Sequence, residues 1–157
     1  MKSMKSIKKI IKTLFFPKKK KIINSNRIIV FGEWFGEKCC DNCLYFANYL
    51  ASNDSSFELY WVSKKECDCS RLDSKIIRIE YDGQKAKEII SKAKFIIVNQ
   101  GIVDITSDAF FYPENSILIN FWHGVAWKKI GSDSVKNKLK ALYTRRAYKK
   151  DGTDYYL

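Results

Sequence analysis

The sequence lacks several features that would place a protein in a familiar class. No apolar run approaches the roughly 18–20 residues of a membrane-spanning helix, so no transmembrane helix is predicted. It contains no phosphate-loop motif, dinucleotide-binding fingerprint or Gly-x-Ser-x-Gly turn. Phosphate-loop nucleotidases, nicotinamide dehydrogenases with the usual fingerprint and serine hydrolases of that type are therefore unsupported. Histidine occurs once, at position 123, which makes His123 the first candidate for a functional side chain.

The five cysteines do not suggest a disulfide framework. Their number is odd and no secretory signal precedes them, which favours a reducing, cytoplasmic compartment. The spacing of Cys40 and Cys43 suits zinc, but Cys67 and Cys69 are only two positions apart, which is tight for a pair of zinc ligands. We interpret the cysteines as free thiols and predict no metal, with a zinc site as the less favoured alternative.

The composition indicates one folded domain with a strongly basic arm. Hydrophobic residues make up 46% of the 157 residues, enough to offset the entropy of the chain and to exclude a disordered protein. The net charge is +12, but residues 1–21 hold nine lysines and no acid. Only three net positive charges remain for residues 22–157, so the predicted division is an arm over 1–21 and a domain over 22–157.

Apolar residues recur in the arm at helical spacing, with lysines between them, and Pro17 ends the pattern. They are Met4, Ile7, Ile10, Ile11, Leu14 and Phe15. The pattern predicts a basic amphipathic helix over 3–15 that attaches to the anionic cytoplasmic face of the cell membrane as a peripheral anchor. A solvated arm, or a helix packed on the domain, is the alternative. Nucleic acid is not a predicted partner, because the arm carries no nucleic-acid motif and the domain is not a basic stripe.

Strand and helix signals alternate through the domain. Apolar runs predict strands over 27–31, 57–62, 75–79, 95–98 and 117–121, and residues 154–157 look like the start of another. Helices are predicted from an N-cap at Asp41 to about Ser52, over 84–93, and over the lysine-rich residues 134–150. This order predicts an α/β fold, with a Rossmann-like parallel sheet covered by helices on both faces.

Three polar or glycine-bearing stretches follow predicted strands. They are residues 32–36, 99–101 and 122–124. Ligands of such sheets bind beyond the carboxyl ends of the strands, so the three stretches are expected to face one crevice. His123 would project there from a strand end beside Gly124 as a general base, and Lys128 and Lys129 suggest an anionic substrate. A core histidine bonded to a backbone carbonyl is the structural alternative.

Taken together, these stretches resemble the N-terminal half of the CDP-glycerol glycerophosphotransferases, the teichoic-acid polyol-phosphate transferases of bacterial cell-wall synthesis. The resemblance runs from about residue 27 to the end of the chain. Its most specific part is Trp122-His123-Gly124 followed by Lys128-Lys129-Ile130-Gly131. It also includes residues 31–38, 41–42, 59–62 and 98–101. Where that run often has a proline, this chain has Ala126.

The resemblance implies the acceptor-side domain of a GT-B architecture, in which His123 takes a proton from the hydroxyl of a lipid-linked polyol-phosphate acceptor. Residues assigned to acceptor or phosphate binding are Glu33, Asp41, Asn99, Gln100, Gly101, Gly124, Lys128 and Lys129. No cofactor is implied. The donor, CDP-glycerol or CDP-ribitol, would bind a second domain.

The family's second half carries a further histidine, and this sequence has no histidine besides His123. We therefore expect a fragment or one part of a split enzyme, with a separately encoded donor domain and little or no transferase activity of its own. The alternative function is a non-catalytic membrane-surface module that binds anionic polymer or lipid.

Overall fold

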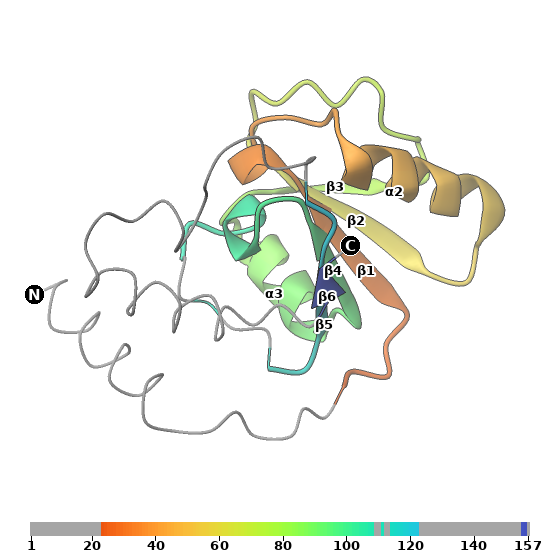
Figure 1. Ribbon diagram of the computed structural model, residues 1–157, viewed down its shortest axis with the longest axis vertical. Coiled ribbons are helices and arrows are strands. Elements are labelled where there is room, and N and C mark those ends of the chain that lie inside the picture. Colours follow the sequence, from red (N-terminus) through yellow and green to blue (C-terminus); the bar gives the residue numbers. More distant parts are fainter. Residues whose placement is uncertain (1–22, 109–110, 112–113, 123–154, 157) are drawn as a thin grey trace, which may run out of the picture. The chain divides into compact units, whose positions relative to one another are not determined.

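The fold of the computed structural model is a doubly wound α/β sheet (Figure 1). The structure describes residues 23–108, 111, 114–122 and 155–156, which belong to one compact unit. Its strands are β1 (Ile28–Gly32), β2 (Glu58–Ser63), β3 (Ile77–Glu80), β4 (Phe95–Val98), β5 (Ile117–Asn120) and β6 (Tyr155–Tyr156). They form a six-stranded sheet in the order β3-β2-β1-β4-β5-β6, in which every pairing is parallel. This is the strand order of Rossmann folds, and the predicted Rossmann-like parallel sheet is confirmed.

The central strand β1 connects the two halves of the sheet. It pairs with β2 in the register Ile29↔Leu59 and with β4 in the register Ile29↔Phe95. Val30 and Phe31 of β1 are fully buried, because helices and loops cover both faces of the sheet.

Helices α2 (Asn42–Asn53) and α3 (Gln84–Lys92) cover opposite faces of the sheet (Figure 1). Alternate strand residues point to opposite faces, so Phe31 packs with Leu44 of α2 whereas Val30 packs with Ile90 of α3. On the α2 face, the rings of Phe31 and Trp61 stack with their centroids 6.3 Å apart. The predicted covering of both faces is confirmed.

The segment between β2 and β3 covers the α2 face without forming a helix. Cys67, Leu72 and Ile76 of this segment belong to the same core cluster as α2. Arg78 on β3 fixes its start, since Nε donates to Ser63 Oγ at 2.7 Å and Nη2 donates to the backbone oxygen of Lys65 at 3.0 Å.

The predicted elements lie close to those observed. The strand predicted over 75–79 begins instead at Ile77, because the backbone amide of Ile76 donates to Asp73 in a turn. The strand predicted to end at Phe121 ends at Asn120, and α2 begins after an N-cap at Asp41, as expected. The predicted arm over 1–21 and helix over 134–150 lie outside the described residues. In the described part of the chain, no helix is long and apolar enough to cross a membrane.

Candidate functional site

The candidate site is built on a buried carboxylate that follows β1. Glu33 is 0% exposed. Its Oε2 accepts hydrogen bonds from the backbone amides of Cys40 and Asp41, each at 3.0 Å, and its Oε1 accepts from the amide of Leu44 at 3.1 Å. These bonds fold the segment after β1 back onto the first turn of α2.

Glu33 also caps α2 from a distance. Among the described residues, the side chain of the N-cap residue Asp41 accepts only from the adjacent amide of Asn42, at 3.0 Å. The third amide of the helix, that of Leu44, would usually bond to the N-cap side chain. Here its side-chain acceptor is Glu33, and it also donates to the backbone oxygen of Asp41 at 3.0 Å. Burial raises the pKa of Glu33, and the bonds from the backbone amides oppose that rise. A carboxylate at this end of the helix also complements the helix dipole.

Asn99, which follows β4, joins the second strand end to the first. Its Nδ2 donates to Glu33 Oε1 at 3.2 Å, and its Oδ1 accepts from Cys43 Sγ of α2 at 3.1 Å. Asn99 is 0% exposed. The segments after β1 and β4 therefore lie together, as predicted from their positions after parallel strands.

A second buried carboxylate, Asp104, is not among the residues that the sequence predicts for the site. It lies in the 3-10 turn η2 (Ile102–Asp104) and is fully buried. Its Oδ2 accepts from the amides of Asn99 and Gln100 at 2.9 and 2.7 Å, and its Oδ1 accepts from the amide of Phe35 at 3.0 Å. Burial raises the pKa of Asp104 against the effect of these amides. The signal available in the sequence is an acid among apolar residues, three positions after the strand-end glycine Gly101.

Three aromatic residues at strand ends have left-handed backbones. Trp34 and Phe35, in the 3-10 turn η1 (Trp34–Gly36), have φ of 46° and 58°, and Trp122 has φ of 56°. Such conformations cost a bulky residue about 1–3 kcal/mol and persist only when the surroundings impose them. Here, Asp104 holds the amide of Phe35, and Asn120 Oδ1 accepts from the amide of Trp122 at 2.9 Å.

The third strand end meets the first at the start of α2. Asn42 Nδ2 donates to the backbone oxygen of Trp122 at 2.9 Å. Trp122 directly precedes His123 in the sequence, so the chain that leads into His123 is fixed at the same end of α2 as Glu33. All three stretches predicted to share a crevice are thus joined by hydrogen bonds around α2.

The predicted site residues have different environments. Asp41 and Gln100 are half-buried, and Gln100 Nε2 has no hydrogen-bond partner among the described residues. Gly101 has φ of 140° and open space where a Cβ would stand. The other four predicted positions, His123, Gly124, Lys128 and Lys129, lie outside the described residues. Two roles stay predictions. One is the binding of acceptor or phosphate by the eight residues assigned to it from the resemblance, and the other is proton transfer by His123.

All five cysteines are free thiols in the structure. Within the described ranges, no group of three or more cysteine, histidine or acidic side chains is placed to hold a metal ion.

Comparison with known protein families gives a match over nearly the whole chain. The model of the CDP-glycerol:poly(glycerophosphate) glycerophosphotransferase family matches residues 13–157. The chain belongs to this family. A comparison with curated proteins gives no match.

Solved structures of the wall teichoic acid polymerase TagF have a similar fold to this glycerophosphotransferase-family chain. A TagF histidine-to-asparagine variant soaked with CDPG is 15% identical over 98% of this chain, with a TM-score of 0.68. TagF without a named substitution gives 15% identity over 98% and a TM-score of 0.65, and a histidine-to-alanine variant gives 17% over 99% and 0.68. The chain spans 38–41% of the length of these three structures. The fold is therefore similar to the α/β fold of the matching part of TagF.

Proposed function

We propose that this chain supplies the acceptor side of a polyol-phosphate transfer, in which a CDP-polyol donates its polyol phosphate to the hydroxyl of a teichoic-acid-like polymer. The observation that carries the proposal is the bond from Asn42 Nδ2 to the backbone oxygen of Trp122, together with the family match over 13–157. It fixes the residue before His123 at the carboxyl edge of the sheet, where ligands of parallel sheets bind.

His123 is the general base of the proposed reaction. Its imidazole takes the proton from the acceptor hydroxyl, and the oxygen attacks the phosphorus next to the polyol of the donor. The bond from that phosphorus to the bridging oxygen breaks, and CMP leaves with the electron pair. Negative charge spreads over the phosphoryl oxygens in the transition state, so the cations Lys128 and Lys129 are proposed to stabilise it.

The buried network at the ends of β1 and β4 supports such a role by positioning. Glu33 and Asp104 bind backbone amides from the segments after β1 and β4, and neither carboxylate is exposed. A base that is held in place contributes more than a mobile one, because positioning of reactants contributes about 7–11 kcal/mol to the lowering of a barrier. Glu33, Asn99 and Asp104 are positioning residues in this proposal.

A chimera tests the reaction. This chain replaces the matching part of TagF, and CMP release from CDP-glycerol is measured with a glycerol phosphate oligomer as acceptor. We expect His123→Ala to lower the rate by about 10²–10⁴-fold, the usual contribution of a general base. Lys85→Ala, at an exposed position on α3, is the matched control and keeps the rate.

Acceptor binding by the 157-residue chain itself is the independent measurement. We expect the glycerol phosphate oligomer to bind saturably, and His123→Ala to bind it as well as the native chain. Full CMP release by the His123→Ala chimera would reject the assigned base. A native chain that neither binds the acceptor nor supports CMP release would contradict the proposed function.

We also propose that residues 1–21 attach the chain to the cytoplasmic face of the membrane. Nine lysines can each contribute about 1 kcal/mol at an anionic surface. The chain is expected to sediment with phosphatidylglycerol vesicles but not with phosphatidylcholine vesicles, and a chain without residues 1–21 is expected to stay in solution. Equal sedimentation of both chains would reject this anchor. Binding of vesicles and polymer without any CMP release from the chimera would favour a non-catalytic surface module.

A further inference from the structure

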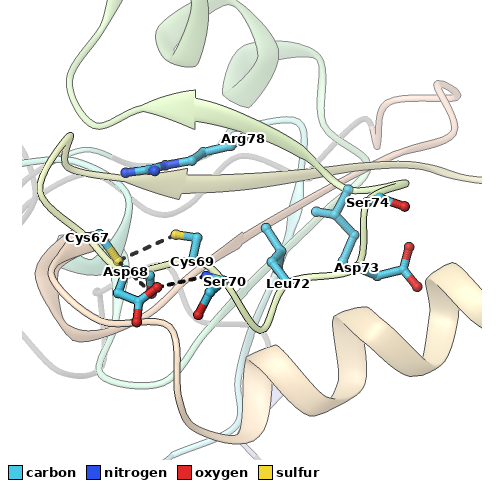
Figure 2. Close-up of a pocket in the computed structure, with 9 residues that line it drawn as sticks. Cys67, Asp68, Cys69, Ser70, Leu72, Asp73, Ser74 and Arg78 are labelled. Atoms are coloured by element: carbon cyan, nitrogen blue, oxygen red, sulfur yellow. Dashed lines mark hydrogen bonds between the residues drawn. The ribbon is translucent and has the colours of Figure 1, made fainter.

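Three of the five thiols gather in the segment that follows β2 and beside it. Cys67 Sγ and Cys69 Sγ are 3.6 Å apart, and Figure 2 shows the two sulfur atoms pointing toward each other. Cys39 belongs to the same core cluster as Cys67. Burial raises the pKa of Cys39, and the neighbouring Cys69 thiol raises it further. The cluster plays no part in the proposed transfer.

The Cys67–Cys69 pair lines a pocket of about 420 Å³ that also includes Leu72 and Arg78 (Figure 2). Cys69 is partly exposed in this pocket, whereas Cys67 is 5% exposed. The pocket gives a small solute a path to the pair from solvent.

The backbone holds the two thiols together. Between them, Asp68 Oδ1 accepts from the amide of Ser70 at 2.9 Å, which turns the chain tightly. On the N-terminal side of the pair, the amide of Cys67 donates to the backbone oxygen of Lys64 at 3.2 Å. On the C-terminal side, the amide of Leu72 donates to the backbone oxygen of Cys69 at 3.0 Å. The approach of the sulfur atoms is therefore part of a hydrogen-bonded loop.

We propose that Cys67 and Cys69 are a modification site, at which hydrogen peroxide converts the two thiols to a reversible disulfide. The thiol of Cys69 releases its proton to solvent, and its sulfur attacks one peroxide oxygen. The O–O bond breaks with its electron pair on the other oxygen, and the hydroxide that leaves takes up a proton from solvent, which gives a sulfenic acid and one water. The sulfur of Cys67 then attacks the sulfur of Cys69 and displaces the hydroxyl as a second water. In total, two thiols are oxidised to one disulfide and one peroxide is reduced to two waters.

The order of the two attacks follows from exposure. Cys69 reacts first because it is the more exposed thiol of the pair. Burial raises the pKa of Cys67, which makes it the less reactive thiol of the two toward peroxide. The sulfur atoms then close from 3.6 Å to about 2.05 Å, the length of a disulfide bond.

The remaining cysteines provide internal controls. Cys40 is exposed, and no thiol contact of it is found within the described residues. Cys43 is fully buried and donates to Asn99. Peroxide is therefore expected to add oxygen to Cys40, or to link two chains through it, and to leave Cys43 a thiol.

Mass mapping of the 157-residue chain tests the site. The chain is treated with hydrogen peroxide, quenched with catalase, unfolded, alkylated with iodoacetamide and digested. We expect the peptide with Cys67 and Cys69 to resist alkylation and to lose the mass of two hydrogen atoms, and dithiothreitol to restore both thiols. A peptide that stays alkylatable, gains oxygen only, or links Cys69 to Cys39 would overturn the proposal.

Two variants sharpen the result. Cys69→Ser is expected to abolish the internal disulfide, whereas the matched variant Cys40→Ser forms it as fast as the native chain. Loss of the disulfide in Cys40→Ser would overturn the proposal, because it would make the exposed thiol the point of attack. If Cys69→Ser fails to fold, the mapping of the native chain still decides.

Discussion

Replacing Glu33 by glutamine should destabilise the described domain far more than the size of the change suggests. The side chain keeps its length and loses only one acceptor oxygen. In the native chain, Oε2 accepts from the amides of Cys40 and Asp41, and Oε1 accepts from Leu44 and Asn99. A glutamine can serve only one of these pairs.

The magnitude follows from the two donors that lose their acceptor. In Glu33→Gln, an amide NH2 faces two N–H groups, and each buried donor without an acceptor costs about 1–3 kcal/mol. Relief of the buried charge offsets part of this cost. We expect the free energy of unfolding at pH 7 to fall by about 2–4 kcal/mol, a large part of the roughly 5–15 kcal/mol of a typical domain.

The pH dependence gives the prediction a sign. Burial raises the pKa of Glu33 above its usual value of 4.5, so the folded chain keeps a proton that the unfolded chain has already lost. The stabilisation from that proton is complete below the unfolded pKa and is lost as pH rises through the folded pKa. Glutamine does not titrate, so the variant does not lose stability in this way as the pH rises. The difference in unfolding free energy between the native chain and the variant is therefore larger at acid pH than at pH 7.

Urea unfolding followed by circular dichroism and tryptophan fluorescence measures both effects. Glu37→Gln is the matched control, because Glu37 is exposed and its pKa is lowered by the hydrogen bond from Lys64 at 2.6 Å. Its substitution should barely change stability, and any change should vanish in acid, which is the opposite sign. Equal stability of Glu33→Gln and Glu37→Gln at pH 7 would refute the capping role of the buried carboxylate.

Three further substitutions test the packing around the site by the same unfolding assay. Gly32→Ala should cost about 1–3 kcal/mol, because its Cβ would stand 2.5 Å from Ile105 Cγ2 and 2.7 Å from the backbone oxygen of Asp104; an unchanged midpoint would contradict this close approach. Asp41→Ala should cost only about 0.5 kcal/mol, the low end for an N-cap, since the buried glutamate already holds the third helix amide; a loss near 2 kcal/mol would contradict that division. Leu118→Ala, at 0% exposure, should cost about 2–5 kcal/mol, and a smaller loss would mean that the α3 face repacks around the cavity.

The sheet could be predicted because its strands are short, continuous apolar runs. Phe95–Val98 was predicted to the residue. The strand predicted over 75–79 begins two residues too early, because Ile76 is apolar for a reason other than being in a strand. It is buried against the α2 face from a turn, and apolar content alone does not separate a strand residue from a turn residue with the same burial.

The site could be predicted only in part. The sequence pointed to Glu33 and Asn99 by their position after strands, but not to the hydrogen bonds that join them across 66 positions. The left-handed Phe35 could not be predicted at all, since a bulky aromatic residue disfavours that backbone by itself. It is imposed by Asp104, 69 positions away, and no local pattern reports such a contact.

The central place of β1 has a consequence for how the chain is made. During synthesis, β4, which begins at Phe95, leaves the ribosome roughly 3–13 s after β1, which begins at Ile28, at about 5–20 residues per second. In that interval, β1–β3 can pair while the far edge of β1 has no neighbour. Glu33 waits equally long for Asn99. The strand that is made first is thus completed by one that is made much later, and the bond between Glu33 and Asn99 forms at the same stage.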